Sequence, residues 1–401
     1  MSRILIISEH ENELFQLSSL LALAKSLKKS GHEISFFVYD IINCHLMMAK
    51  EGFDVFQTPI PFRFNENNIA PPSYYHLLKE HQYHIFDFLI YRILAYQKIY
   101  QQHMPDLLIF DYSPGAYIAS LKFNVARVVI GNGYKIPQLY SSTHYYKYQN
   151  NNIQETSKKN EIEVRTTINN VLKEINGPQL TTLNSLFVND AQILATFPEL
   201  DHCNRINGDY WGVKPFFKNS VMKKLEWPSK MEMKKIFIYL TTDRSIFNIF
   251  KAVQQFDFST FIYTKIIKSR YRKYNNGCIE LSTENENINQ RIEEADFVIC
   301  NADHDIVCSA LYNGKPLLLL PEKFEQSITA RNVIEIEAGI MTDINSIQDI
   351  FTKIELLTGD QKYKKNAQMF ALKYKDYSSD YFLDRFCNLI DQLLLSKYRK
   401  S

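Results

Sequence analysis

The first forty residues constrain the fold most strongly, because they read as a strand, a helix and a second strand. "RILIIS" (Arg3–Ser8) is a short apolar run, typical of a buried parallel strand. "LFQLSSLLALAKSLKKSG" follows with apolar residues at helical spacing and ends in the helix-stop residues Lys28, Lys29 and Gly31. "HEISFFVYD" is the next strand. Two strands joined by a helix form a right-handed βαβ unit, so we predict an α/β fold with a parallel sheet.

The same alternation continues beyond this unit. We predict, in chain order, a long aromatic helix over Tyr74–Gln102, a strand at Asp106–Asp111, a helix after Pro114, a strand at Ala126–Gly131, helices over 160–189 and the strand "QILAT". Residues 138–160 are polar and rich in tyrosine without any periodicity, which indicates a mobile loop. The segment Leu139–Tyr148 within it could clamp an apolar acceptor, lie on lipid headgroups or contact a protein partner.

A second strand–helix series begins at "KIFIYL" (Lys235–Leu240) and continues through "DFVIC" and "PLLLLP". Residues 213–234 carry two prolines and scattered charge, as a linker does. With 401 residues the chain is long enough for two domains. We predict an N-terminal Rossmann-like domain over 1–212, a linker over 213–234, a C-terminal Rossmann-like domain over 235–380, and a helix over 381–401 that packs back on the N-terminal domain.

Charge and cysteine usage narrow the ligand class and the compartment. Lys and Arg number 46 and Asp and Glu number 44, a balance that argues against a general nucleic-acid binder. The six cysteines form no C-x-x-C pair, which fits a reducing cytoplasm. The N-terminus does not read as a signal peptide, and no run reaches the ~18 apolar residues that span a bilayer. We therefore expect a cytoplasmic protein with a small-molecule or protein ligand.

Four segments of this chain resemble the GT-B fold, nucleotide-sugar-dependent glycosyltransferases of the UDP-glycosyltransferase type. They are the opening βαβ with its "GHE", the run "PDLLIFDYSPGAYIASLKFNVARVVIGNGYKIP", the run "FPELDHCNRINGDYWGV" and the run "EEADFVICNADHDIVCSALYNGKPLLLLPEKFEQSITARNVIEIEAGI". The last is similar to the family's donor-binding segment, which contains "HGGHGT". The resemblance covers most of the chain and implies two Rossmann-like domains facing each other across a cleft.

The resemblance also implies a reaction. The N-terminal domain would hold a small-molecule or lipid-linked acceptor, and the C-terminal domain a nucleotide-diphosphate sugar, most simply a UDP-hexose. Family members usually invert the anomeric centre by direct displacement, with a first-loop His as base and an Asp that orients it. The nucleotide sugar is a co-substrate, and no further cofactor or metal is expected. An alcohol is a poor nucleophile, so a positioned base must take its proton.

The first loop departs from the family pattern. The family's Gly-His pair falls here on Phe15 and Gln16, and a glutamine cannot act as a base. His10 is on the same loop and is a candidate base, or else an ordinary surface residue. Asp111 is retained at the end of its strand. It could orient a base, serve as a weaker one, or simply cap the loop ahead of Ser113 and Pro114.

The donor loop departs as well, because "HGGHGT" becomes "NADHDI", Asn301 to Ile306. Glycines there let a diphosphate approach the backbone amides. Asp303 and Asp305 instead add negative charge where the phosphates would lie. Asp303 is also a plausible N-cap that would satisfy those amides with its own carboxylate. A metal held by Asp303, His304 and Asp305 is not favoured, because adjacent side chains point in different directions.

Other donor-site positions persist. Thr241 and Thr242 follow a strand and could bind the β-phosphate, or could make ordinary turn contacts. His304 matches the second histidine of the family motif and would face the diphosphate, unless it pairs with the neighbouring aspartates. Glu325 and Gln326 fall where an acidic-Gln pair would contact sugar hydroxyls, or they lie at a solvated helix N-terminus. Asn301, Asp303 and Asp305 complete this set of predicted donor-site residues.

A second function is compatible with these departures. A GT-B-fold protein that has lost its chemistry could activate or stabilise an active enzyme, and the missing first-loop His and donor-loop glycines are what that hypothesis predicts. The histidines of the aromatic helix, His76, His81 and His84, are interpreted as core packing and not as a metal site. The sugar, the acceptor and the oligomeric state do not follow from the sequence.

Overall fold

The computed structural model describes most of the chain: residues 1–9, 14–59, 73–138, 146–148, 154–187, 191–203, 205, 207–216, 226–229, 232–242, 246–264, 276–283 and 288–398. These residues form two compact units. Unit 1 comprises Met1–Thr196, Asp201–Phe217 and Ser379–Ser401, and unit 2 comprises Phe197–Leu200 and Lys218–Ser378. None of the helices in the described ranges has the length and apolarity that crossing a bilayer requires.

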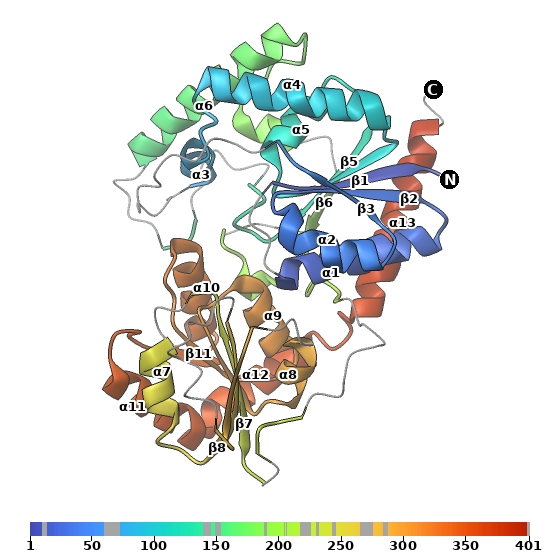
Figure 1. The fold of residues 1–401 in the computed structure, drawn as a ribbon. Coiled ribbons are helices and arrows are strands. Elements are labelled where there is room, and N and C mark those ends of the chain that lie inside the picture. Colours follow the sequence, from blue (N-terminus) through green and yellow to red (C-terminus); the bar gives the residue numbers. More distant parts are fainter. Residues whose placement is uncertain are drawn as a thin grey trace. The chain divides into compact units, whose positions relative to one another are not determined.

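Unit 1 is built on a six-stranded parallel sheet with the order β3-β2-β1-β4-β5-β6. Its strands are β1 (Arg3–Ser8), β2 (Glu33–Val38), β3 (Asp54–Gln57), β4 (Leu107–Asp111), β5 (Ala126–Gly131) and β6 (Ala191–Leu194). Its helices are α1 (Leu14–Lys29), α2 (Ile41–Lys50), α3 (Tyr74–Glu80), α4 (Phe86–His103), α5 (Pro114–Ser120), α6 (Gln154–Glu174) and α13 (Ser379–Tyr398). Helices flank the strands (Figure 1). The strands carry apolar runs because both faces of a parallel sheet are covered.

Alternation along each strand sends side chains to two helical layers of unit 1. Ile4 and Ile6 of β1 belong to a core cluster with residues of α1, α2 and α13. On β4, Ile109 joins that cluster, whereas the ring of Phe110 packs at 5.2 Å against Tyr117 of α5. The sheet is therefore buried on both sides, as the predicted βαβ unit requires.

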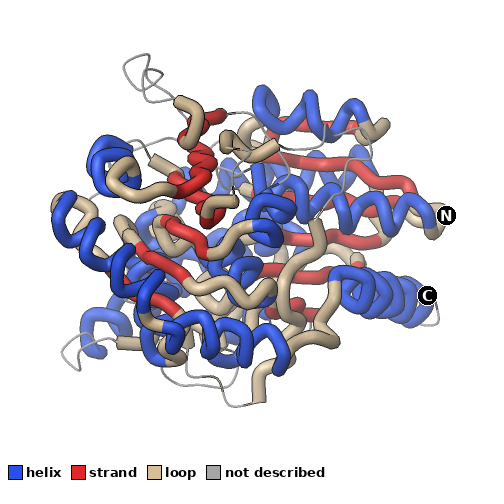
Figure 2. The backbone as a smooth tube through the Cα atoms, turned by 90° about the horizontal axis from the view of Figure 1, so that it is seen from below, coloured by secondary structure: helices blue, strands red, loops and turns tan. Residues whose placement is uncertain are grey.

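Unit 2 repeats this plan with a second six-stranded parallel sheet, in the order β12-β11-β10-β7-β8-β9. Its strands are β7 (Lys234–Leu240), β8 (Phe258–Thr264), β9 (Ile279–Ser282), β10 (Phe297–Cys300), β11 (Leu317–Leu319) and β12 (Gly339–Met341). Its helices are α7 (Ile246–Val253), α8 (Ile288–Glu294), α9 (His304–Tyr312), α10 (Phe324–Glu335), α11 (Ile347–Gly359) and α12 (Gln361–Lys373). Figure 2 shows these helices and strands in a second view. The predicted α/β class with two Rossmann-like sheets is confirmed.

The two units do not simply follow one another along the chain, because each contains stretches that are separated in the sequence. Phe197, on a short segment between two stretches of unit 1, is fully buried in unit 2, where its ring lies 5.0 Å from that of Phe370 and 4.4 Å from that of Tyr374. The final helix α13 belongs to unit 1, where Phe382 packs at 5.3 Å against Trp211. Each unit is thus assembled from separate stretches of sequence.

Two local predictions are wrong. The aromatic helix expected over Tyr74–Gln102 is broken into α3 and α4, because the chain turns at His81 and Gln82 adopts a left-handed φ of 66°. The expected loop over 138–160 ends early, since α6 begins at Gln154, and the segment after α6 is a short 3-10 helix at Leu183–Phe187. Most of the predicted Tyr-rich segment lies outside the described residues.

Candidate functional site

Sheet topology marks two places where a ligand would bind. In parallel α/β sheets the binding crevice lies beyond the carboxyl ends of neighbouring strands whose connections run to opposite sides. In unit 1 those strands are β1 and β4, and in unit 2 they are β7 and β10. The predicted catalytic residue Asp111 ends β4, and the predicted donor-site residues Thr241 and Asn301 follow β7 and β10.

A hydrogen-bond network joins three strand ends of unit 2. Asn301 is fully buried, and its side-chain oxygen Oδ1 accepts from the Thr241 backbone amide at 3.0 Å. Its Nδ2 donates to the Leu320 carbonyl at 3.0 Å and to Glu322 Oε1 at 2.9 Å. The Thr242 hydroxyl donates to the same glutamate oxygen at 2.7 Å. The loops after β7, β10 and β11 are therefore fixed to one another at the switch point.

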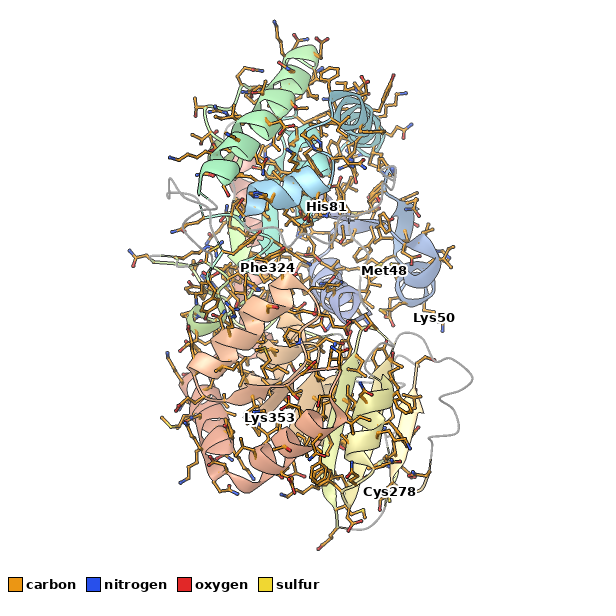
Figure 3. The ribbon with its side chains drawn as sticks, turned by 90° about the vertical axis from the view of Figure 1, so that its left-hand side faces the viewer. Met48, Lys50, His81, Cys278, Phe324 and Lys353 are labelled. Carbon is orange, nitrogen blue, oxygen red and sulfur yellow. The ribbon has the colours of Figure 1, made fainter. Side chains whose placement is uncertain are left out.

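Glu322 is a centre of this network that the sequence analysis passed over. The signal was available, because Glu322 comes directly after the apolar run "PLLLLP", where the loop beyond the strand begins. Gln326 is used internally too: its Oε1 accepts from the amides of Glu322 and Lys323 at 2.8 and 3.0 Å. The buried Gln326 therefore organises the N-terminus of α10, whose first residue, Phe324, is labelled in Figure 3. Glu325, beside it, is partly exposed.

The N-cap interpretation of Asp303 is wrong. Asp303 occupies the N-cap position of α9, but within the described helix its side chain makes no capping hydrogen bond. Its Oδ1 instead accepts from Gln326 Nε2 at 3.3 Å. Ala302, which aligns with a glycine of the motif that the sequence resembles, has a left-handed backbone with φ 63°. Glycine adopts such a backbone readily, whereas alanine rarely does.

His304 contacts the next turn of its own helix. Its Nε2 lies 3.4 Å from Cys308 Sγ, and both residues are buried. Asp305, on the first turn of α9, is partly exposed. The His304 imidazole and the carboxylates of Asp303 and Asp305 therefore follow β10, and a third carboxylate, of Glu322, comes from the loop after β11.

In unit 1, by contrast, a side chain already occupies the corresponding helix terminus. The Glu9 carboxylate accepts from the amides of Gly115 and Ala116, at the start of α5, at 3.1 Å each. It also accepts from the Tyr83 hydroxyl at 3.2 Å. Glu9 was not singled out in the sequence, although it directly follows β1. Because its carboxylate fills the place of an anionic ligand, unit 2 is the better candidate for binding a diphosphate.

Asp111 is buried and does not cap a loop. Its side chain is 1% exposed, and neither carboxylate oxygen has a hydrogen-bond partner among the described residues. Lys214 Nζ lies 3.9 Å from Oδ1 and is itself 4% exposed. The loop-capping interpretation is therefore wrong, because Glu9 performs that role. His10 lies outside the described residues, and Gln16 is partly exposed on α1.

The break between α3 and α4 places His81 near the end of β4. Its Nδ1 lies 3.0 Å from the hydroxyl of Tyr112, the residue after Asp111. Among the described residues, no three or more His, Cys, Asp or Glu side chains are arranged so that they could hold a metal ion.

Comparison with known proteins relates the whole chain to one group of structures. No family model matches the sequence, and no curated protein matches it significantly. Among solved structures, the spinosyn rhamnosyltransferase SpnG aligns with a TM-score of 0.67 and 14% identity over 98% of this chain and 99% of its own. The glycosyltransferase VinC in complex with DTDP aligns with a TM-score of 0.69 and 13% identity over 99% and 100%. SnogD from Streptomyces nogalater aligns with a TM-score of 0.65 and 12% identity over 98% of this chain and 99% of its own. The chain therefore has the GT-B fold of these glycosyltransferases.

Proposed function

We propose that the protein is an inverting glycosyltransferase that moves a sugar from a nucleotide-diphosphate sugar to a small-molecule or lipid-linked acceptor. The observation that carries this proposal is the amino end of α9 at the β7/β10 switch point, which Asp303 does not cap. A helix amino terminus binds phosphate through its free amides and its dipole. The likeness to glycosyltransferases over almost the full length of both chains supports the same reading.

The donor would lie over the loops after β7 and β10. The amides of the first turn of α9 would hold the diphosphate, with the hydroxyls of Thr241 and Thr242 and the imidazole of His304 beside it. Glu325 would bind sugar hydroxyls. UDP is the nucleotide expected from the sequence, and the DTDP bound to VinC makes dTDP the second candidate.

Chemically, transfer is one displacement. The acceptor oxygen bonds to the anomeric carbon while its proton passes to a base, and the bond from that carbon to the phosphate oxygen breaks. The nucleoside diphosphate leaves with the electron pair. Preorganised amides that face the leaving group stabilise its developing charge.

A non-catalytic partner of an active enzyme is the second candidate, and one observation favours it. Asp303, Asp305 and Glu322 gather at the amino end of α9. A like-charge contact at ~4 Å with an effective dielectric of about 20 costs about 4 kcal/mol before relaxation. A diphosphate would meet this repulsion unless the carboxylates move or are neutralised.

Thermal-shift titration separates the two functions. UDP, dTDP and their hexose conjugates should stabilise a transferase by about 2.7 kcal/mol at one hundred times Kd. Thr242→Val should weaken that stabilisation, whereas Thr358→Val on α11, whose hydroxyl bonds only within its own helix among the described contacts, should not. If none of the nucleotides moves the transition, the transferase assignment is wrong and the partner role is favoured.

A further inference from the structure

Helix α12 of unit 2 and the two residues after it carry a concentrated positive charge. Residues 361–375 contain five lysines and no Asp or Glu, although basic and acidic residues are nearly balanced over the whole sequence. Two of these lysines, Lys362 and Lys373, form ion pairs with glutamates of the same unit. The other three are exposed and form no ion pair with any described residue: Lys364, Lys365 and Lys375.

Two large apolar side chains are exposed on the same helix. Met369 is 67% exposed and Leu372 is 69% exposed. Residues three or four positions apart are neighbours on a helix surface, so Lys365, Met369 and Leu372 follow one another along one face, and Lys375 continues the same spacing. The opposite face of α12 is the one that packs inward, through the buried Ala367 and Phe370. The outward face is therefore an apolar pair set between lysines.

The turn after α9 borders this face. The Tyr312 hydroxyl donates to the Lys375 carbonyl at 3.4 Å, and a Cβ added to Gly314 would lie 3.5 Å from Gln368 Cα. Burial lowers the pKa of Lys315 on this turn, and the charge of Lys364 acts in the same direction, whereas Asp296 opposes both. A fourth lysine and a partly exposed tyrosine thus lie at the edge of the face.

We propose that the α12 face, defined by Lys364, Lys365, Met369, Leu372 and Lys375, docks reversibly on an anionic membrane surface. The ammonium groups would lie among the lipid phosphates, and the two apolar side chains would enter the boundary between headgroups and acyl chains. All five residues belong to unit 2, and the inference does not depend on the proposed transferase function.

Charge complementarity and size favour a membrane over other occupants. In a symmetric dimer the same patch meets itself, so a second copy of the chain would place lysines against lysines. A standard protein interface also buries ~800 Å² on each partner, far more than two apolar side chains supply. A soluble polyanion would use the lysines but would leave Met369 and Leu372 in water. An anionic membrane uses both kinds of side chain.

Cosedimentation of the full chain with vesicles tests this proposal. Wild-type protein should bind vesicles of phosphatidylglycerol and phosphatidylcholine, should bind pure phosphatidylcholine much more weakly, and should lose affinity as salt is added. Lys365→Gln should weaken binding to the anionic vesicles about fivefold, which corresponds to about 1 kcal/mol for one charge near such a surface. Leu372→Gln should weaken it about tenfold, because a leucine side chain no longer leaves water.

Helix α4 of unit 1 provides matched controls. Its outward face also exposes a large apolar pair, Tyr91 and Leu94, but the exposed charges beside this pair, Asp87 and Lys98, balance. Lys98→Gln and Leu94→Gln therefore repeat the two substitutions without a basic surround, and both should bind vesicles as wild-type protein does. All four variants should keep the wild-type unfolding midpoint, since each replaced residue is exposed.

Four results would overturn the proposal. The first is wild-type protein that does not bind anionic vesicles, or that binds pure phosphatidylcholine equally well. The second is binding that Lys365→Gln and Leu372→Gln leave unchanged, because another surface would then carry it. The third is binding that Lys365→Gln weakens and Leu372→Gln does not, as expected for a soluble polyanion. The fourth is a wild-type dimer, seen by sedimentation velocity, that either α12 variant dissociates.

Discussion

Replacing Asn301 by alanine should destabilise unit 2 selectively. The substitution removes the acceptor of the Thr241 amide and the donor to the Leu320 carbonyl, and it also removes the bond to Glu322. Leu320 is fully buried, so its carbonyl would be left without a partner away from water. A buried polar group that loses its partner costs about 1–3 kcal/mol. With two such backbone groups, one of them partly exposed, we expect a loss of about 3 kcal/mol.

The chain provides a separate reporter for each unit. It has two tryptophans: Trp211 lies in unit 1 and Trp227 in unit 2, and both are buried. In a Trp211→Phe background, fluorescence-monitored urea unfolding follows unit 2 alone, and in a Trp227→Phe background it follows unit 1. Asn301→Ala should lower the urea midpoint of unit 2, seen in the Trp211→Phe background, and leave that of unit 1, seen in the Trp227→Phe background, unchanged.

Thr242→Val is the matched control, because it removes only one bond of the same network, from a partly exposed hydroxyl. Its cost should be about 1 kcal/mol. A loss below 1 kcal/mol for Asn301→Ala, or equal shifts in both units, would show that the network does not hold the strand ends of unit 2 together.

Three further predictions use the same reporters. Gly115→Ala should destabilise unit 1 by about 1–3 kcal/mol, since the added Cβ would lie 2.6 Å from Arg92 Cδ; a neutral result would mean that the side chain yields freely. Ala302→Gly should stabilise unit 2 by up to about 1 kcal/mol, as relief of the left-handed strain exceeds the added chain entropy; a loss would contradict this. Burial alone would raise the pKa of Glu199, but hydrogen bonds from Lys373 and Tyr374 outweigh it and lower that pKa from its ordinary value. The stability that these bonds provide is therefore present above the unfolded-state pKa and is lost as pH falls through the folded one. Glu199→Gln should therefore flatten the acid limb of the unit 2 stability profile, and an unaltered limb would exclude that contribution.

The fold could be predicted because its signals are local and repeated. Short apolar runs alternate with amphipathic segments, and a parallel sheet needs both. The prediction over Tyr74–Gln102 failed for a physical reason: apolar spacing continues through His81, and a single left-handed residue, Gln82, breaks the helix without any Gly or Pro to announce it.

The site was predictable in position but not in its contacts. The strand-end rule located Asp111, Thr241 and Asn301, and applied to every strand end it would also have found Glu9 and Glu322. Which carboxylate faces which amide depends on tertiary placement. For that reason sequence reasoning could offer a capping role for Asp303 and for Asp111 only as an alternative, whereas in the structure Asp303 makes no capping bond and Glu9 caps α5.

The buried Phe197 has a consequence for anyone who recombines these proteins. A chimera that exchanged residues 218–378 as one block would transfer unit 2 without Phe197, whose ring packs against those of Phe370 and Tyr374. The segment to exchange is discontinuous. It comprises Phe197–Leu200 together with Lys218–Ser378, and the last helix, α13, stays with unit 1. Crossover points for exchanging the two units therefore number four, whereas the single block 218–378 has only two.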